Sequence, residues 1–272
     1  MYVSCSCLVC DKRKYPTVQE SLRKIKELGF NAFDLDALEN WQRINPSELA
    51  AGNEIWVEQF VDMVANLELK VSSINCSLSK ELTDPDPVAF KQYKKEFLAL
   101  LDLSERVNSS NITLQPGPIP KGYSHEGALN VLRIHLLELC QLKTGYHASV
   151  SLEGHANTVI EDHELALDVI KGFWPGMGFT YDPSHFVMRE IELNRTERLL
   201  DYTVHVHVRN ASSGKMQDTM VNGKVDIEWL INALKAHSYD GALTIEYFEN
   251  FDYNFENVLA LRKRLIELGV EA

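Results

Sequence analysis

The stretch GFTYDPSHF, residues 178–186, places a carboxylate and a histidine three residues apart. The run FTY is strand-like and leads to Asp182, and Pro183 then breaks the strand. A carboxylate at the end of a strand, with His185 in the following turn, suits a divalent metal ion. The plain alternative is an Asp-Pro-Ser turn that stops the strand and leaves His185 exposed.

Three other strand-like runs end in a similar polar residue: SVSLEGH carries Glu153, TVHVHVRN carries His207, and LTIEYFE carries Glu246. Taken singly, Glu153 fits a cap of the next turn and Glu246 fits a partner for a lysine. When these three residues and Asp182 are considered together, coincidence is a poorer explanation of four polar strand ends than a shared site. His205 lies one layer below His207 on the same strand face, and we expect it to be a hydrogen-bonded core histidine.

Three carboxylates and one imidazole that converge in a partly dry site repel one another unless a cation lies among them. Mixed oxygen and nitrogen ligands suit one divalent ion and do not choose among Mn, Co, Mg and Zn. The expected metal ligands are Glu153, Asp182, His207 and Glu246.

Strand-like and helix-like segments alternate along the whole chain, which predicts a parallel sheet. Eight such pairs in 272 residues predict an α/β fold, a single (β/α)8 TIM barrel over residues 1–272. The runner-up is an open doubly wound sheet, but the first strand is followed by CDKR instead of a glycine-rich turn. The expected strands are 2–9, 32–35, 71–78, 111–115, 147–153, 179–182, 203–208 and 243–247, and the expected helices are 17–28, 54–69, 84–107, 125–142, 162–173, one within 191–200, 226–236 and 258–268.

The formal net charge of -12 disfavours nucleic acid and anionic membranes as partners. No apolar run approaches the roughly 18 residues of a membrane span, and the first residues have their charges after the apolar part, unlike a secretory signal. Five cysteines do not suggest a disulfide framework in a chain of this size, so we expect a cytoplasmic setting. Cys5, Cys7 and Cys10 fit small apolar strand residues better than a metal cluster.

Several of these motifs resemble those of the xylose isomerase-like barrels, the sugar phosphate isomerase/epimerase superfamily. The resemblance covers nearly the whole chain and is densest from Glu153 onward. It implies metal ligands at the residues already named and substrate contacts at His155 and His185. Members of the superfamily isomerise or epimerise sugars, dehydrate cyclitols, or cut DNA at abasic sites. The segments that carry the resemblance are LEGHANT (152–158), FTYDPSHF (179–186), HVRN (207–210), NGKVD (222–226) and YDGALTIE (239–246).

The expected chemistry is removal of a proton α to a carbonyl, through an enediolate whose charge a metal stabilises. We expect Glu153 and Glu246 to be the catalytic carboxylates, one of which removes the proton while the other returns it. Return to the opposite face is epimerisation, return to the neighbouring carbon is isomerisation, and loss of a β-hydroxyl is dehydration. The expected function is a metal-dependent sugar isomerase or epimerase. The alternative is a lyase or dehydratase acting on an inosose or keto-glycoside.

The chain departs from two branches of this superfamily. The DNA-cutting branch needs histidines where Asn75 and Gln115 end the third and fourth strands here, so an endonuclease is a remote alternative. Ketose 3-epimerases hold substrate with an arginine beyond the seventh strand, where SSG stands here, and Arg209 or Lys215 is available in its place. Arg209 also stands where the family has lysine, and Asn210 where it has aspartate.

The second strand carries Asp34, where many relatives have a glutamate that points into the site. Asp34 is expected to contact substrate, and the open alternative is that Asp34 and Asp36 form a solvated strand end. Trp41 and Trp174 are candidates for a sugar platform, whereas Trp56 lies in a helical pattern and fits the core. A non-catalytic sugar-binding barrel is a further alternative, and homo-oligomers are expected by analogy. The full set of expected substrate contacts is His185, His155, Arg209, Asp34, Asn75 and Gln115.

Overall fold

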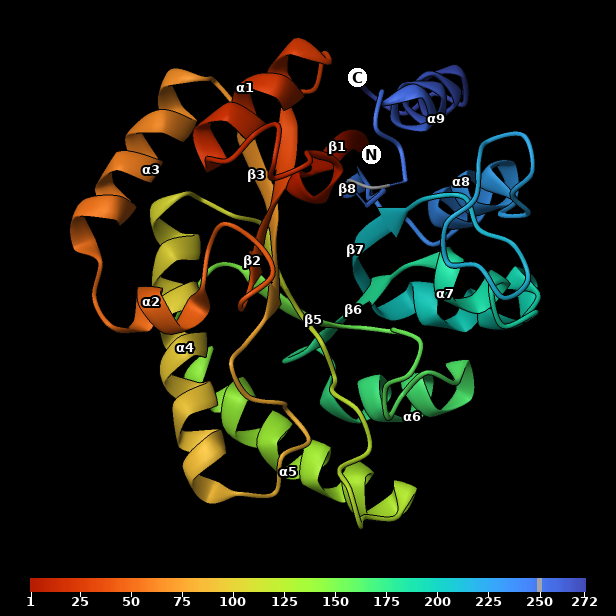
Figure 1. Cartoon of the computed structure of the whole chain (residues 1–272). Helices are drawn as coiled ribbons and strands as arrows, with labels where there is room; N and C mark the ends of the chain where they lie inside the picture. Colours follow the sequence, from red (N-terminus) through yellow and green to blue (C-terminus); the bar gives the residue numbers. More distant parts are fainter. Residues whose placement is uncertain (249–250) are drawn as a thin grey trace.

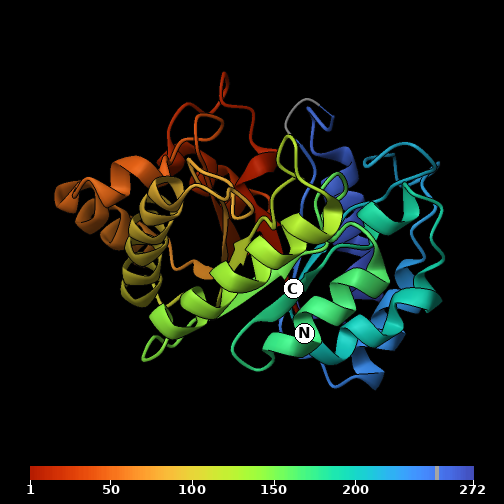
Figure 2. The same ribbon diagram turned by 90° about the horizontal axis from the view of Figure 1, so that it is seen from below.

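A computed structural model describes residues 1–248 and 251–272. It shows a closed barrel of parallel strands in which every strand pairs with its neighbour in sequence, and β8 returns to β1 (Figure 1). Helices surround the barrel on the outside, as Figure 2 shows from below. The strands are β1 Tyr2–Ser6, β2 Ala32–Leu38, β3 Lys70–Ser77, β4 Asn111–Leu114, β5 Ser149–Glu153, β6 Gly178–Tyr181, β7 Thr203–Val208 and β8 Ala242–Ile245. The expected (β/α)8 architecture is confirmed.

Amphipathic helices cover the outer face of the barrel and bury their apolar sides against it. Thr17 begins the first of them with a reciprocal capping box to Glu20, and Pro87 and Pro183 each open a helix at its first position. The α-helices are α1 Val18–Glu27, α2 Pro46–Ala50, α3 Glu54–Asn66, α4 Pro87–Arg106, α5 His125–Leu142, α6 His163–Phe173, α7 Pro183–Val187, α8 Ile227–Ala236 and α9 Glu256–Glu267, with 3-10 helices η1 Cys7–Val9 and η2 Leu193–Tyr202.

The two termini close the barrel together. Figures 1 and 2 both place N and C side by side, and Val3 N donates a hydrogen bond to Glu271 O at 2.8 Å. In the part of the chain that the structure describes, no helix combines the length and the apolar character that a membrane crossing requires.

The inside of the barrel is polar, although branched apolar residues usually fill such interiors. Small hydroxyl and amide side chains from alternate strand positions hydrogen-bond to one another in the centre. One such network joins Asn111, Ser73, Thr113, Ser151 and Thr180. These short side chains leave space above them for the larger polar groups at the carboxyl ends of the strands.

The predicted helix 125–142 and strand 203–208 have the observed bounds. The second strand runs on to Leu38 instead of ending at residue 35. All of its residues are buried, and polar and apolar residue types continue to alternate past Leu35. The first strand ends at Ser6, whose side chain accepts a hydrogen bond from Leu8 N and starts a 3-10 turn. Cys7 therefore lies in η1, although it is buried as expected of a small apolar residue.

Two short helices were not predicted, and both begin with proline. Pro183 was interpreted only as a strand break, but proline is favoured at the first position of a helix, and both Pro46 and Pro183 take that position. The helix expected within 191–200 is the 3-10 helix η2. The first of these proline-led helices extends the β2–α3 connection, and the second carries His185 into the barrel mouth.

Candidate active site

Four polar side chains from adjacent strands meet at the carboxyl rim of the barrel. Glu153 ends β5, Asp182 caps α7 directly after β6, His207 lies in β7, and Glu246 follows β8. All four are buried, and one ligand atom from each lies within 4.8 Å of the others. Oxygen or nitrogen ligands about 2.0–2.3 Å from one ion are at most about 4.6 Å apart, so the set suits the first shell of one cation after a slight contraction.

His207 lies between two of these carboxylates. Its Nδ1 is 2.9 Å from Glu153 Oε1 and 3.5 Å from Glu246 Oε2. Its Nε2 has no hydrogen-bond partner among the described residues, which is uncommon for a fully buried polar atom. Nε2 instead faces Asp34 Oδ2 at 3.3 Å, so Nδ1 is the nitrogen that points toward a cation among Glu153 and Glu246.

Arg209 brings a permanent positive charge into the same cluster. Its guanidinium donates hydrogen bonds to Asp182 Oδ2 at 2.7 Å and to Glu246 Oε2 at 2.8 Å. Its Nε donates to Ser184 Oγ at 3.0 Å, and its side chain is 1% exposed. The arginine therefore binds the carboxylates themselves. The sequence motif gave no signal for Ser184 as its partner.

The protonation of the cluster follows from burial and these neighbours. Burial opposes ionisation of Glu153, but the charge and hydrogen bond of His207 hold its pKa well below the usual value. Burial raises the pKa of Glu246 to about 7, although His207 and Arg209 act in the opposite direction. Burial also disfavours charge on His207, but Glu246 and Glu153 outweigh it and raise the pKa of this imidazole well above its usual value.

Two amides fix the orientation of the glutamates. Asn75 Nδ2 donates to Glu246 Oε1 at 2.8 Å, and Gln115 Nε2 donates to Glu153 Oε2 at 2.5 Å. Asn75 Oδ1 is buried and has no hydrogen-bond partner among the described residues. Asn75 and Gln115 thus support the carboxylates, and their expected contacts with substrate stay predictions.

His155 and His185 form a second wall of the site, with ring centroids 4.1 Å apart. His185 Nε2 lies 3.5 Å from Asp182 Oδ2 and 3.9 Å from Glu153 Oε1. Burial lowers the pKa of His185 to about 3, so its imidazole is neutral at physiological pH. The alternative of an exposed His185 in a turn is wrong, because α7 buries it.

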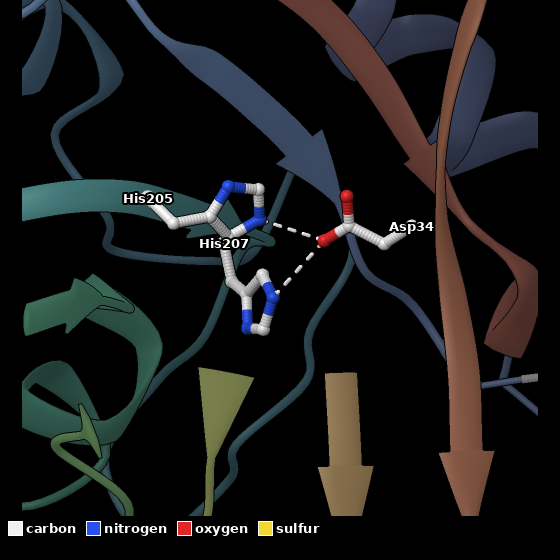
Figure 3. A group of neighbouring side chains, drawn as sticks. All are labelled: Asp34, His205 and His207. Carbon is white, nitrogen blue, oxygen red and sulfur yellow. Dashed lines mark hydrogen bonds and ion pairs between the residues drawn. The ribbon is translucent and has the colours of Figure 1, made fainter. Parts of the chain in front are cut away.

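Asp34 and His205 lie below this rim, in the interior of the barrel. His205 Nε2 is 2.7 Å from Asp34 Oδ2, and both side chains are buried, which confirms the expectation of a hydrogen-bonded core histidine (Figure 3). The alternative of a solvated strand end is wrong, because β2 extends past Asp36 and buries both aspartates. Ser6 Oγ donates to Asp36 at 2.9 Å, and the alternation beyond Leu35 was the signal that Asp36 points inward.

The tryptophans lie in different places. Trp41 is about half exposed and packs edge-on against Phe248, whose ring lies 5.1 Å from the Arg209 guanidinium, so Trp41 lies near the mouth of the barrel. Trp174 precedes β6 and thus lies at the opposite end of the barrel from the site, so its expected place in a sugar platform is wrong. Trp56 is half-buried, stacks on Phe60 within α3 and packs against the core.

Residues 22–264 match the family model described as xylose isomerase-like TIM barrel. The chain belongs to this family. Among curated proteins, a sequence search finds no match. The xylose isomerase-like assignment agrees with the closed barrel and with the motifs at the ends of β5 to β8.

Solved structures of this fold are similar over almost their whole length. A protein described as D-tagatose 3-epimerase-like superposes with a TM-score of 0.80 at 18% identity, covering 98% of each chain. The 3-keto-D-glucoside 4-epimerase of E. coli gives 0.76 at 18% identity, again with 98% of each chain. The IOLI protein, solved with a binding zinc atom, gives 0.76 at 14% identity over 98% of each chain. At these levels of sequence identity, the similarity shows a shared fold alone.

Proposed function

We propose that this xylose isomerase-like chain is a divalent-metal-dependent isomerase or epimerase that acts on a sugar or keto-sugar by proton abstraction α to a carbonyl. One observation carries the proposal: the buried convergence of Glu153, Asp182, His207 and Glu246 within 4.8 Å. The names of two similar structures support the substrate class. One is described as a 3-keto-D-glucoside 4-epimerase and the other as a D-tagatose 3-epimerase-like protein.

The residues present fit a metal ion. His207 has a nitrogen directed at two carboxylates, and mixed oxygen and nitrogen donors suit Mn, Co, Mg or Zn. Glu153, Asp182, His207 and Glu246 would hold the ion. When bound, it supplies positive charge that stabilises negative charge as it develops on the oxygens of the substrate.

The protein side chains supply the remaining parts of the reaction. Glu153 and Glu246 lie on strands separated by two others, so they can face a bound sugar from two sides. One removes the proton and the other returns it, provided that a free oxygen of each reaches the carbon. His185, neutral and buried, can share hydrogen bonds with a substrate hydroxyl, and His155 lies beside it.

A lyase or dehydratase acting on an inosose or keto-glycoside is the second candidate. It uses the same proton removal, and the chain favours it at one point: SSG occupies residues 212–214, where ketose 3-epimerases have an arginine. The donors of Arg209 bind Asp182, Glu246 and Ser184, which supports a role for Arg209 within the carboxylate cluster in place of that arginine's role.

Elemental analysis of the purified protein, followed by incubation with ketoses, 3-keto-glycosides and inososes in D₂O, tests the proposal. We expect one divalent ion per chain and incorporation of solvent deuterium at one carbon of a substrate. NMR of the product separates an inverted centre, a moved carbonyl and a lost hydroxyl. A protein without metal and without exchange in any sugar would instead be a non-catalytic binding barrel. Several zinc ions per chain with salt-sensitive DNA binding would indicate the nuclease branch.

A further inference from the structure

Asp34 lies on the inner face of β2 and reaches the imidazoles of β7 on the other side of β1 and β8 (Figure 3). Its Oδ2 is 2.7 Å from His205 Nε2 and 3.3 Å from His207 Nε2. A single carboxylate oxygen therefore faces both histidines, and one of these is a proposed metal ligand.

The carboxylate of Asp34 is held from several sides. Ser72 Oγ donates to Oδ1 at 2.6 Å and Thr244 Oγ1 donates to the same oxygen at 2.9 Å, while His205 occupies Oδ2. Both oxygens of Asp34 thus accept hydrogen bonds from groups other than His207. Its position is fixed by the barrel and does not depend on His207.

The two ring nitrogens of His207 have different surroundings. Nδ1 faces Glu153 Oε1 at 2.9 Å and Glu246 Oε2 at 3.5 Å, on the side where the proposed ion would lie. Nε2 faces Asp34 at a distance slightly longer than an ordinary hydrogen bond, and it has no other hydrogen-bond partner among the described residues. A fixed carboxylate on the far side of a ligating imidazole decides which nitrogen keeps its proton.

We propose that Asp34 is a positioning residue that holds a proton on His207 Nε2 and so presents Nδ1 as the metal-binding atom. His205 and the two hydroxyls keep the Asp34 carboxylate in place for this task. The inference rests on the proposed function, and it gives Asp34 a role through His207 in place of the expected contact with substrate.

A second metal ion bound by Asp34, His205 and His207 is the competing explanation, because these three also present ligand atoms close together. The contacts favour the hydrogen-bonded network. Three donors already occupy the Asp34 carboxylate, and an ion there would have to displace the 2.7 Å bond from His205.

The test uses the 272-residue chain labelled with ¹⁵N-histidine, freed of metal and then titrated with Zn²⁺. The ring nitrogen shifts of His207 are assigned by their loss in His207→Gln. In the wild type we expect Nε2 to carry a proton before and after zinc is added, and only Nδ1 to respond to zinc. In Asp34→Asn the amide donates to Nε2, so Nε2 loses its proton, Nδ1 keeps one, and zinc affinity falls by roughly 10- to 100-fold.

Ser73→Ala is the matched control, since Ser73 pairs with Asp34 in the β2–β3 register but bonds to the Asn111 and Thr113 network instead. It should leave the His207 shifts and the zinc affinity unchanged. An Asp34→Asn protein that keeps the proton on Nε2, or a wild type in which zinc binds Nε2 or two ions bind, overturns the inference. The nitrogen shifts without metal test Asp34 even if no zinc binds, and absence of binding would count against the proposed function alone.

Discussion

Arg209 Nη2 lies 2.7 Å from Asp182 Oδ2, inside a cluster whose other groups are arranged to attract a cation. The guanidinium remains charged at any pH at which the protein is folded. One guanidinium and the proposed divalent ion would together balance the charges of the three clustered carboxylates. Arg209 thus stands beside the proposed metal site as a counter-ion, at the position where the family has lysine.

Replacement of Arg209 by methionine should separate this role from catalysis. Loss of one partner of a buried ion pair costs about 3–5 kcal/mol, so we expect the metal-free variant to unfold in less urea than the wild type. Its affinity for Mn²⁺ should rise, because the ion then relieves the repulsion between Asp182 and Glu246. Arg209→Lys, which keeps the charge, is the control. Equal stability of the methionine variant and the wild type in chelator would contradict this account.

Glu153 and Glu246 should both be needed for metal binding and for deuterium exchange into substrate. Glu153→Gln and Glu246→Gln each keep the size of the side chain but remove a charge, so we expect metal to be lost during dialysis. Deuterium exchange into substrate should fall by about 10²- to 10⁴-fold, the usual contribution of a positioned acid or base. Glu58→Gln, on the exposed side of α3, should bind and exchange as the wild type does. Full exchange in Glu246→Gln would exclude Glu246 from catalysis.

The stability of the metal-free protein should depend on pH in a defined direction. The pKa of Glu246 is about 7 in the folded chain and near 4.3 when unfolded, so the folded state binds this proton more tightly. Stability is therefore highest below about pH 4.3 as far as this group is concerned, and it falls by about 3 kcal/mol as pH rises to 7. Urea unfolding between pH 5 and 8 in chelator measures this slope, and Glu246→Gln should flatten it. If the pH dependence of stability is unchanged in Glu246→Gln, another titratable group is responsible for it.

The ends of β5 to β8 were predictable because a parallel barrel brings the carboxyl ends of its strands to one rim. Glu153 and Asp182 follow strand-like runs, so their place at the strand ends was clear from the sequence alone. The contacts of Arg209 were not, since its partners Glu246 and Ser184 are distant in sequence and nothing in HVRN indicates that the side chain turns inward. Pairing across the barrel, as between Asp34 and His205, depends on strand tilt and stagger, which a one-dimensional pattern does not contain.

The long β7–α8 connection is anchored beside the site by Asn210. Its Oδ1 accepts hydrogen bonds from Val225 N at 3.0 Å and Ala211 N at 3.1 Å, and its backbone N donates to the Tyr247 hydroxyl at 3.0 Å. A Cβ on Gly223 would lie only 2.0 Å from Asn210 Cγ, so this close approach requires glycine.

Gly223→Ala should therefore push Asn210 away and disturb its neighbours Arg209 and Tyr247 at the edge of the site. We expect a loss of about 1–3 kcal/mol in the free energy of unfolding, together with weaker metal binding. Gly172→Ala is the matched control, because a Cβ there meets nothing within 4 Å and the residue lies inside α6. That change should stabilise the protein by about 0.5–1 kcal/mol, as alanine does in a helix. If both alanine variants unfold alike and bind Mn²⁺ alike, the Asn210 anchor has no part in shaping the site.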